Sequence, residues 1–171
     1  MSRVRKHLGW VTALVLPGIA AAQTRLSPAL ATMDIAPAGL TLTKGGDLRF
    51  PEGFPGQGSV NDNAAATWSV SNPQGVSLSI SFALPTALSG PGTSTIPLTY
   101  GSTSGAHTLS PPGTQVLFNP TAGTTVTGAS ASGTIFLGQS FGGAADFVTA
   151  TVGTVPSGNY RATIVLTVAV L

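Results

Sequence analysis

Few side chains of this sequence could carry acid–base or nucleophilic chemistry. Beyond residue 22 the chain holds one histidine, His107, and it contains no cysteine. His107 lies in the Ser- and Gly-rich stretch Ser104–Thr108, which is typical of a turn, and a catalytic histidine usually has an orienting partner that this stretch does not supply. We therefore expect His107 to be an exposed loop residue. The missing cysteines exclude thiolate nucleophiles and thiolate metal sites.

One short motif matches a hydrolase pattern. Gly138–Gly142 reads Gly-Gln-Ser-Phe-Gly, the G-x-S-x-G of a nucleophile elbow. That elbow places its serine between a strand and a helix, whereas Gly143-Ala144-Ala145 leads into another β-like segment. We therefore interpret Ser140 as a β-turn serine and predict no catalytic residue. A hydrolase, which needs Ser140 and His107 within about 3 Å of each other, ranks last among three alternatives.

Candidate metal and ion-pair residues are equally sparse. Asn61-Asp62-Asn63 brings three oxygen-bearing side chains together, but it lacks the spaced carboxylates and final Glu of a calcium loop, so side-chain caps of a tight turn explain it. Asp47 and Arg49 flank Leu48 and suggest an exposed ion pair worth about 0–1 kcal/mol. No metal site, cofactor-binding site or cofactor is predicted.

The first 22 residues differ from the rest of the chain. Arg3, Arg5 and Lys6 precede an apolar run and a small-residue cleavage site, Ala20-Ala21-Ala22, which together indicate a signal peptide over residues 1–22. The apolar run is shorter than the ~20 residues that span a bilayer, so no membrane span is predicted. From Gln23 on, four basic residues oppose five acidic ones, a formal net charge of −1, which argues against nucleic-acid binding. We expect an exported protein of the periplasm, cell surface or extracellular space.

The remaining residues favour strands over helices. Lys, Glu, Arg and Gln are scarce, and apolar residues recur at every second position. The clearest run is Tyr160–Leu171, in which Tyr160, Ala162, Ile164, Leu166, Val168 and Val170 share one face. A second run, Val76–Leu84, follows Trp68, Val70 and the turn Asn72–Gly75, a pattern that indicates a hairpin with Trp68 in the core.

Shorter segments complete the set of predicted strands. They are Ile35–Thr43, Asp47–Phe50, Ile96–Tyr100, Gln115–Phe118, Gly133–Phe141 and Asp146–Val152, whereas Pro51–Ala65 and Gly101–Gly113 are predicted loops. Many strands without intervening helices favour an all-β fold, an immunoglobulin-like antiparallel β-sandwich, with a closed barrel as the alternative. We expect an N-terminal arm or first strand over residues 23–44 and a β-sandwich domain over residues 45–171.

The order of these segments resembles a known family. Asp47-Leu48-Arg49-Phe50, Ala66–Val70, Val76–Leu84, Phe136-Leu137-Gly138 and Gly158–Val168 are similar to an uncharacterised group of exported bacterial β-sandwich proteins, itself similar to spore coat protein U and fimbrial subunits. The resemblance covers about Gly45–Leu171 and carries no catalytic residue. Pro51 departs from its pattern, which commonly has Gly there, and the disulfide frequent in fimbrial subunits is excluded.

The resemblance implies a non-enzymatic structural or cell-surface protein, such as a fimbria-like or coat-like assembly subunit. Its partners would be other copies of itself or related subunits, joined by strand addition between sheet edges. Residues 23–44, with Leu26, Leu30, Met33 and Ile35, are the expected donated arm. The second-ranked alternative is an adhesive or carbohydrate-binding β-sandwich module that would use the two predicted loops.

Overall fold

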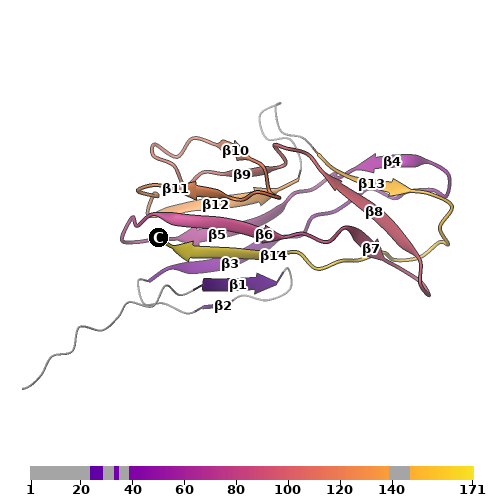
Figure 1. Cartoon of the computed structure of the whole chain (residues 1–171), viewed down its shortest axis with the longest axis horizontal. Helices are drawn as coiled ribbons and strands as arrows, with labels where there is room; N and C mark the ends of the chain where they lie inside the picture. The colour runs from indigo at the N-terminus through magenta and orange to yellow at the C-terminus, as the bar shows by residue number, and fades with distance from the viewer. Residues whose placement is uncertain (1–23, 29–32, 35–38, 139–146) are drawn as a thin grey trace, which may run out of the picture.

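The structure is a computed structural model that describes residues 24–28, 33–34, 39–138 and 147–171. These residues form fourteen strands and no helix, and the strands make three sheets in which every neighbouring pair is antiparallel (Figure 1). The predicted all-β antiparallel sandwich is therefore confirmed. Its immunoglobulin-like character stays a prediction.

Two of the sheets pack face to face. The first sheet has the order β1 (Thr24–Pro28), β14 (Val165–Val170), β6 (Leu78–Ala83) and β11 (Thr124–Val126). The second has the order β10 (Val116–Phe118), β9 (Gly105–His107), β12 (Ser132–Leu137), β5 (Ala66–Ser71), β3 (Thr41–Gly46) and β2 (Met33–Asp34). One apolar core unites side chains from both sheets, which makes this part of the molecule a sandwich.

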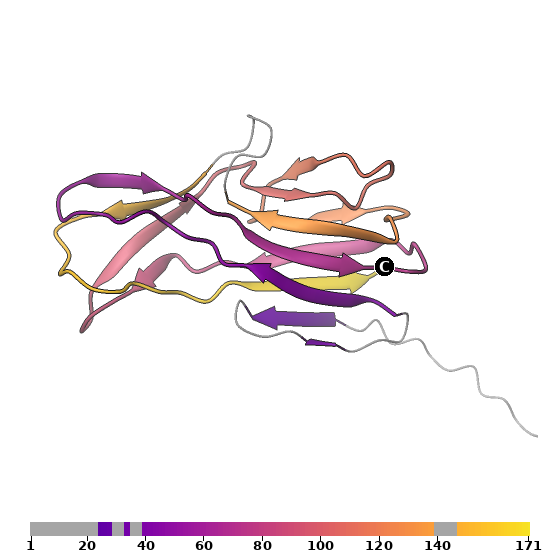
Figure 2. The same ribbon diagram turned by 180° about the vertical axis from the view of Figure 1, so that it is seen from behind.

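A third sheet, which we call the end sheet, extends the molecule away from its C-terminus (Figures 1 and 2). It has the order β4 (Gly58–Asn61), β13 (Val148–Val152), β8 (Thr95–Tyr100) and β7 (Ala87–Ser89). Val60, Ile96, Ala150 and Val152 form a second, smaller core on one of its faces. Phe50 and Leu98 pack against both cores, so the two are continuous.

Period-two burial explains why these segments are strands. Trp68 and Val70 of β5 are buried, and so are Leu166 and Val168 of β14, as their alternation predicts. β14 begins only at Val165, however, so the predicted strand over Tyr160–Leu171 is too long. The neighbouring strand β6 ends at Ala83, which pairs with Val165 of β14. Residues 160–164 therefore have no β6 residue to pair with.

The predicted hairpin over Trp68–Leu84 is wrong. β5 lies in the second sheet and β6 in the first, so the turn between them crosses from one sheet to the other. Buried Asn72 holds this crossing: its side-chain amide donates to Val76 O at 3.0 Å and to Ala129 O at 3.4 Å. Alternation is the same for a strand that pairs with its predecessor and for one that packs across the core, so the pattern cannot separate the two.

Other boundaries also differ from the predictions. The predicted loops contain strands β4 and β9, the predicted strand Asp47–Phe50 makes only an isolated bridge between Arg49 and Ala64, and the short strands β7 and β11 were not predicted. β3, β8, β10, β12 and β13 overlap their predicted segments, and the parts of those segments at 35–38, 139–141 and 146 lie outside the described residues.

The N-terminal arm contributes an edge strand to each sandwich sheet. β1 pairs antiparallel with β14 from Thr24↔Ala169 to Pro28↔Val165, and β2 pairs with β3 through Met33↔Leu42 and Asp34↔Thr41. β1 and β2 are the outermost strands of their sheets. Leu40 and Leu42, at the end of the expected arm, are buried in the main core. The described part of the arm therefore consists of two edge strands followed by the first residues of a core strand.

Candidate functional site: an apolar groove beside two arginines

The structure places His107 in the interior, not in an exposed loop. It lies in β9 between β10 and β12 and is 1% exposed. Its Nδ1 accepts a hydrogen bond from Leu109 N at 3.3 Å, and its ring lies 5.9 Å from that of Phe118. The expectation fails because β9 pairs with residues that are distant in sequence, and no local pattern shows this pairing. Burial lowers the pKa of His107, since it disfavours the charged imidazolium.

This lowered pKa predicts a pH-dependent stability. The unfolded chain binds the His107 proton more tightly than the folded chain does, so we expect full stability above about pH 6.5 and a loss as the pH falls below that value. Urea unfolding of the chain from Gln23 should show its midpoint fall between pH 7.5 and 5.5. In His107→Asn, which keeps an acceptor for Leu109 N, that slope should be weaker. Equal slopes in the two proteins would contradict this assignment.

Ser140 and most of its motif lie outside the described residues, so the Ser140–His107 geometry needed by a hydrolase stays untested. Gly138, the first residue of the motif, lies close to the side chains of Asp62 and Leu48. Across the part of the chain that the structure describes, no three His, Cys, Asp or Glu side chains gather as metal ligands would. Nor does any helix in that part have the length and hydropathy of a bilayer crossing.

Asp62 joins two strands of the end sheet instead of capping a tight turn. It is buried, its Oδ1 accepts a hydrogen bond from Val148 N at 2.7 Å, and its own N donates to Val148 O at 2.9 Å. Its neighbour Asn61 accepts a hydrogen bond from Thr149 Oγ1 at 3.0 Å. The Asn61 and Asp62 side chains thus help to hold β4 against β13. No local pattern indicates this role, because the partners are more than 80 residues away in the sequence.

The expected ion pair has a different cation. Lys44 pairs with Asp47, and Arg49 forms no ion pair with any other described residue. The three residues lie at the end of β3 and in the segment that follows it, where a register shift between Lys44 and Gly46 interrupts the pairing of β3 with β5. Arg49 is therefore an exposed cation with no ion-pair partner within the described ranges.

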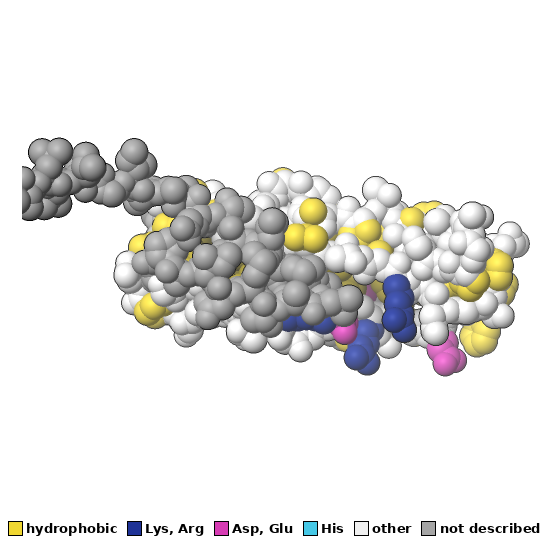
Figure 3. Space-filling model, turned by 90° about the horizontal axis from the view of Figure 1, so that it is seen from below, with side chains coloured by type: hydrophobic (Ala, Val, Ile, Leu, Met, Phe, Trp, Pro, Cys, Tyr) yellow, Lys and Arg dark blue, Asp and Glu magenta, His cyan; other side chains and the backbone are white. Residues whose placement is uncertain are grey.

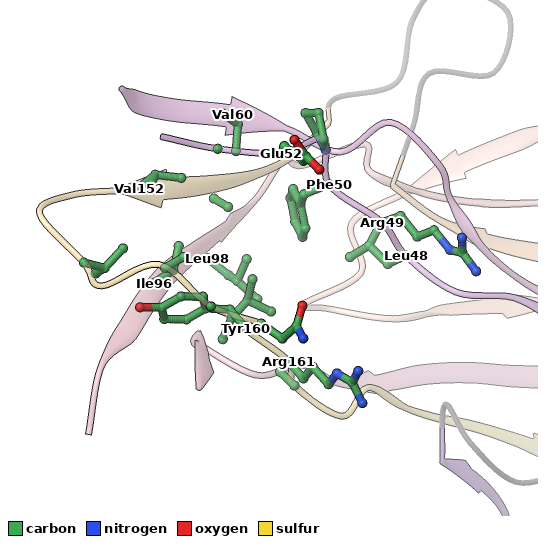
Figure 4. A pocket seen from close by; sticks show the side chains of 18 of the residues that line it. Leu48, Arg49, Phe50, Glu52, Val60, Ile96, Leu98, Val152, Tyr160 and Arg161 are labelled. Carbon is green, nitrogen blue, oxygen red and sulfur yellow. The ribbon is translucent and has the colours of Figure 1, made fainter. Parts of the chain in front are cut away.

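A groove of about 1130 Å³ lies on the face of the end sheet that carries the smaller core. Its floor is formed by side chains of the end sheet, including Val60, Ile96, Leu98 and Val152 (Figure 4). Two extended segments, residues 47–55 and 155–164, form its walls. These segments are far apart in the sequence and neither is a named strand, so periodicity does not reveal the groove.

An aromatic side chain from each wall faces the apolar floor. Phe50 comes from the first wall and Tyr160 from the second, and both pack against the smaller core (Figure 4). The Tyr160 hydroxyl donates to Pro156 O at 2.8 Å, which satisfies its polar end while the ring lies against Gly90. Trp68, by contrast, lies in the main core, as predicted.

Charge is concentrated beside this groove. Asp47, Arg49, Glu52 and Arg161 line it, in a chain of which only 7% of residues are charged. Figure 4 shows the Arg49 and Arg161 side chains extending to the same side of the groove from its two walls. Basic side chains gather in the middle of one face of the molecule (Figure 3). Like Arg49, Arg161 is exposed and has no ion-pair partner among the described residues.

The groove thus combines an apolar floor, two aromatic rings and, at one side, two guanidinium groups that no described carboxylate pairs with, an arrangement that suits ligand binding. Comparison with known proteins adds no assignment, and the resemblance to spore coat protein U and fimbrial subunits stays a prediction. The chain matches no protein-family model, no curated protein and no solved structure.

Proposed function

We propose that this chain is an exported, non-enzymatic structural protein of the cell surface, a fimbria-like or coat-like subunit whose copies join by strand addition. The supporting observation is the position of β1. This five-residue strand comes from the N-terminal arm, forms the edge of the first sheet and pairs with the last strand, β14. The arm of a second copy has the same sequence, so it can make the same contacts with β14.

The physics of this exchange is favourable because the pairing itself does not change. Removing β1 exposes a row of unpaired N–H and C=O groups on β14, and an incoming β1 satisfies them again. β14 keeps its own place between β1 and β6, so the exchange takes place at a sheet edge and leaves the core intact. Exchange then introduces no strain, but it carries the entropic cost of bringing two copies together. The assembly should therefore depend on protein concentration.

Truncation tests this proposal. We compare the predicted mature chain, Gln23–Leu171, with a chain that begins at Gly39 and so lacks β1 and β2. Starting at Gly39 keeps Leu40 and Leu42, whose loss would damage the core. Light scattering during size-exclusion chromatography should show concentration-dependent oligomers of the longer chain and monomers of the shorter one.

A synthetic peptide of residues 23–38 serves as the matched control. It should bind the shorter chain, whose β14 edge is open, and should bind the longer chain more weakly. If both chains are monomeric at every concentration, or if the shorter chain still forms oligomers, assembly through this strand is contradicted.

A further inference from the structure

We propose that the groove on the end sheet binds a medium- or long-chain fatty acid, with the hydrocarbon chain on the apolar floor and the carboxylate between Arg49 and Arg161. This site is independent of the proposed strand exchange, which involves β1 and β14. The argument rests on the floor, on the two arginines and on the backbone groups that are already paired.

The floor provides a surface for a hydrocarbon chain. Val60, Ile96 and Val152 are buried, but Leu98, Phe50 and Tyr160 keep part of their apolar surface accessible beside them. These side chains come from β4, β13, β8 and the two walls, so the apolar surface runs across the sheet rather than forming a point contact. Covering such surface contributes about 25 cal/mol per Å².

The two arginines explain why the ligand should be an anion. Arg49 and Arg161 lie on opposite walls and extend to the same side of the groove (Figure 4). Both are exposed and neither has an ion-pair partner among the described residues. Of the two carboxylates that line the groove, Asp47 is paired with Lys44, and Glu52 lies apart from both arginines in Figure 4. A carboxylate between the two guanidinium groups would accept charge-assisted hydrogen bonds from both.

On the floor of the groove, backbone pairing favours a hydrocarbon over a peptide. β13 and β8 are inner strands of the end sheet, and their backbone groups pair with β4, β7 and each other. On the walls, Arg49 N donates to Ala64 O and Arg161 exchanges two hydrogen bonds with Ser89. A peptide would bring its own N–H and C=O groups, which need partners, whereas an alkyl chain needs none.

Calorimetric titration with laurate, below the concentration at which it forms micelles, tests the proposal. The protein is the chain from Gln23, and the expected result is saturable binding with one site and a negative heat-capacity change, the sign of apolar burial. Amide shifts in the NMR spectrum should cluster at Ile96, Val152 and Tyr160.

Two charge variants separate this site from non-specific adsorption. Arg49→Gln/Arg161→Gln should weaken laurate binding by about tenfold or more, because it removes the charged donors. Lys44→Gln, a matched loss of charge outside the groove lining, should leave the affinity unchanged. Dodecyl maltoside, with the same alkyl chain and a neutral head, should bind more weakly than laurate and equally to all three proteins.

Several outcomes would overturn the proposal. They are absence of saturable laurate binding, equal laurate affinity in the double variant, or shifts confined to residues outside the groove. Binding only to anionic phospholipid vesicles, or self-association that the double variant abolishes in the absence of laurate binding, would assign the groove to a membrane or to a second copy instead.

Discussion

Replacing Trp68 with alanine is expected to lower the free energy of unfolding by about 3–5 kcal/mol, the usual cost of deleting a buried large aromatic side chain. Trp68 is fully buried in β5, between β12 and β3, and its ring lies 5.6 Å from that of Phe82 in the facing sheet. The lost contacts therefore belong to both layers of the sandwich. The total free energy of unfolding of a small domain is about 5–15 kcal/mol, so the variant should be close to unfolding at room temperature.

Trp68→Phe is the matched control. Trp68 Nε1 is buried without a hydrogen-bond partner among the described residues, so phenylalanine removes no hydrogen bond and leaves a smaller cavity. Urea unfolding followed by circular dichroism should place its stability much closer to the parent than to Trp68→Ala. Near-parental stability of the alanine variant would contradict the position of Trp68 in the core.

Gly123→Ala should be the second strongly destabilising change. Gly123 has φ +73°, in the left-handed region, and an added Cβ would lie 2.6 Å from the backbone oxygen of Ile80 in β6. The conformation costs about 1–2 kcal/mol for a residue with a Cβ. Moving a backbone oxygen in a packed sandwich adds about 1–3 kcal/mol. β11, which follows this turn and pairs with β6, should lose protection from hydrogen exchange first.

Gly92→Ala separates the two costs. Gly92 has φ +63°, and an added Cβ would meet nothing within 4 Å. It should therefore show only the cost of the left-handed conformation, and chemical denaturation should rank it clearly above Gly123→Ala in stability. Equal losses in the two variants would show that contact with Ile80 plays no part.

The sequence predicted the fold class and the buried faces of the main strands because both follow from local alternation. Trp68 and Val70, and likewise Leu166 and Val168, are two residues apart, and the structure buries all four. The hairpin was wrong because the same alternation serves strands in facing sheets. The burial of His107 could not be predicted, because it depends on pairing with strands β10 and β12, which local composition cannot reveal.

The groove could not be predicted for the same physical reason. Phe50 and Tyr160 lie more than a hundred residues apart, in walls that are not strands, and only the fold brings them to one face of the end sheet. The sequence feature most closely related to the groove is the scarcity of charged residues, of which Arg49 and Arg161 are two. No sequence pattern links Arg49 with Arg161, because only the folded structure brings them to the same groove.

Cross-linking between single-cysteine chains tests most directly whether the arm is exchanged between copies. The sequence contains no cysteine, so Leu26→Cys in one chain and Thr167→Cys in another introduce one thiol each, at positions paired in β1 and β14. If copies exchange the arm, mixing the two chains and oxidising them should give a disulfide-linked heterodimer. Pairing Leu26→Cys with Thr151→Cys, an exposed residue of the end sheet, should give none. A disulfide that forms only within a chain carrying both Leu26→Cys and Thr167→Cys, and never between the single variants, would contradict assembly by strand addition.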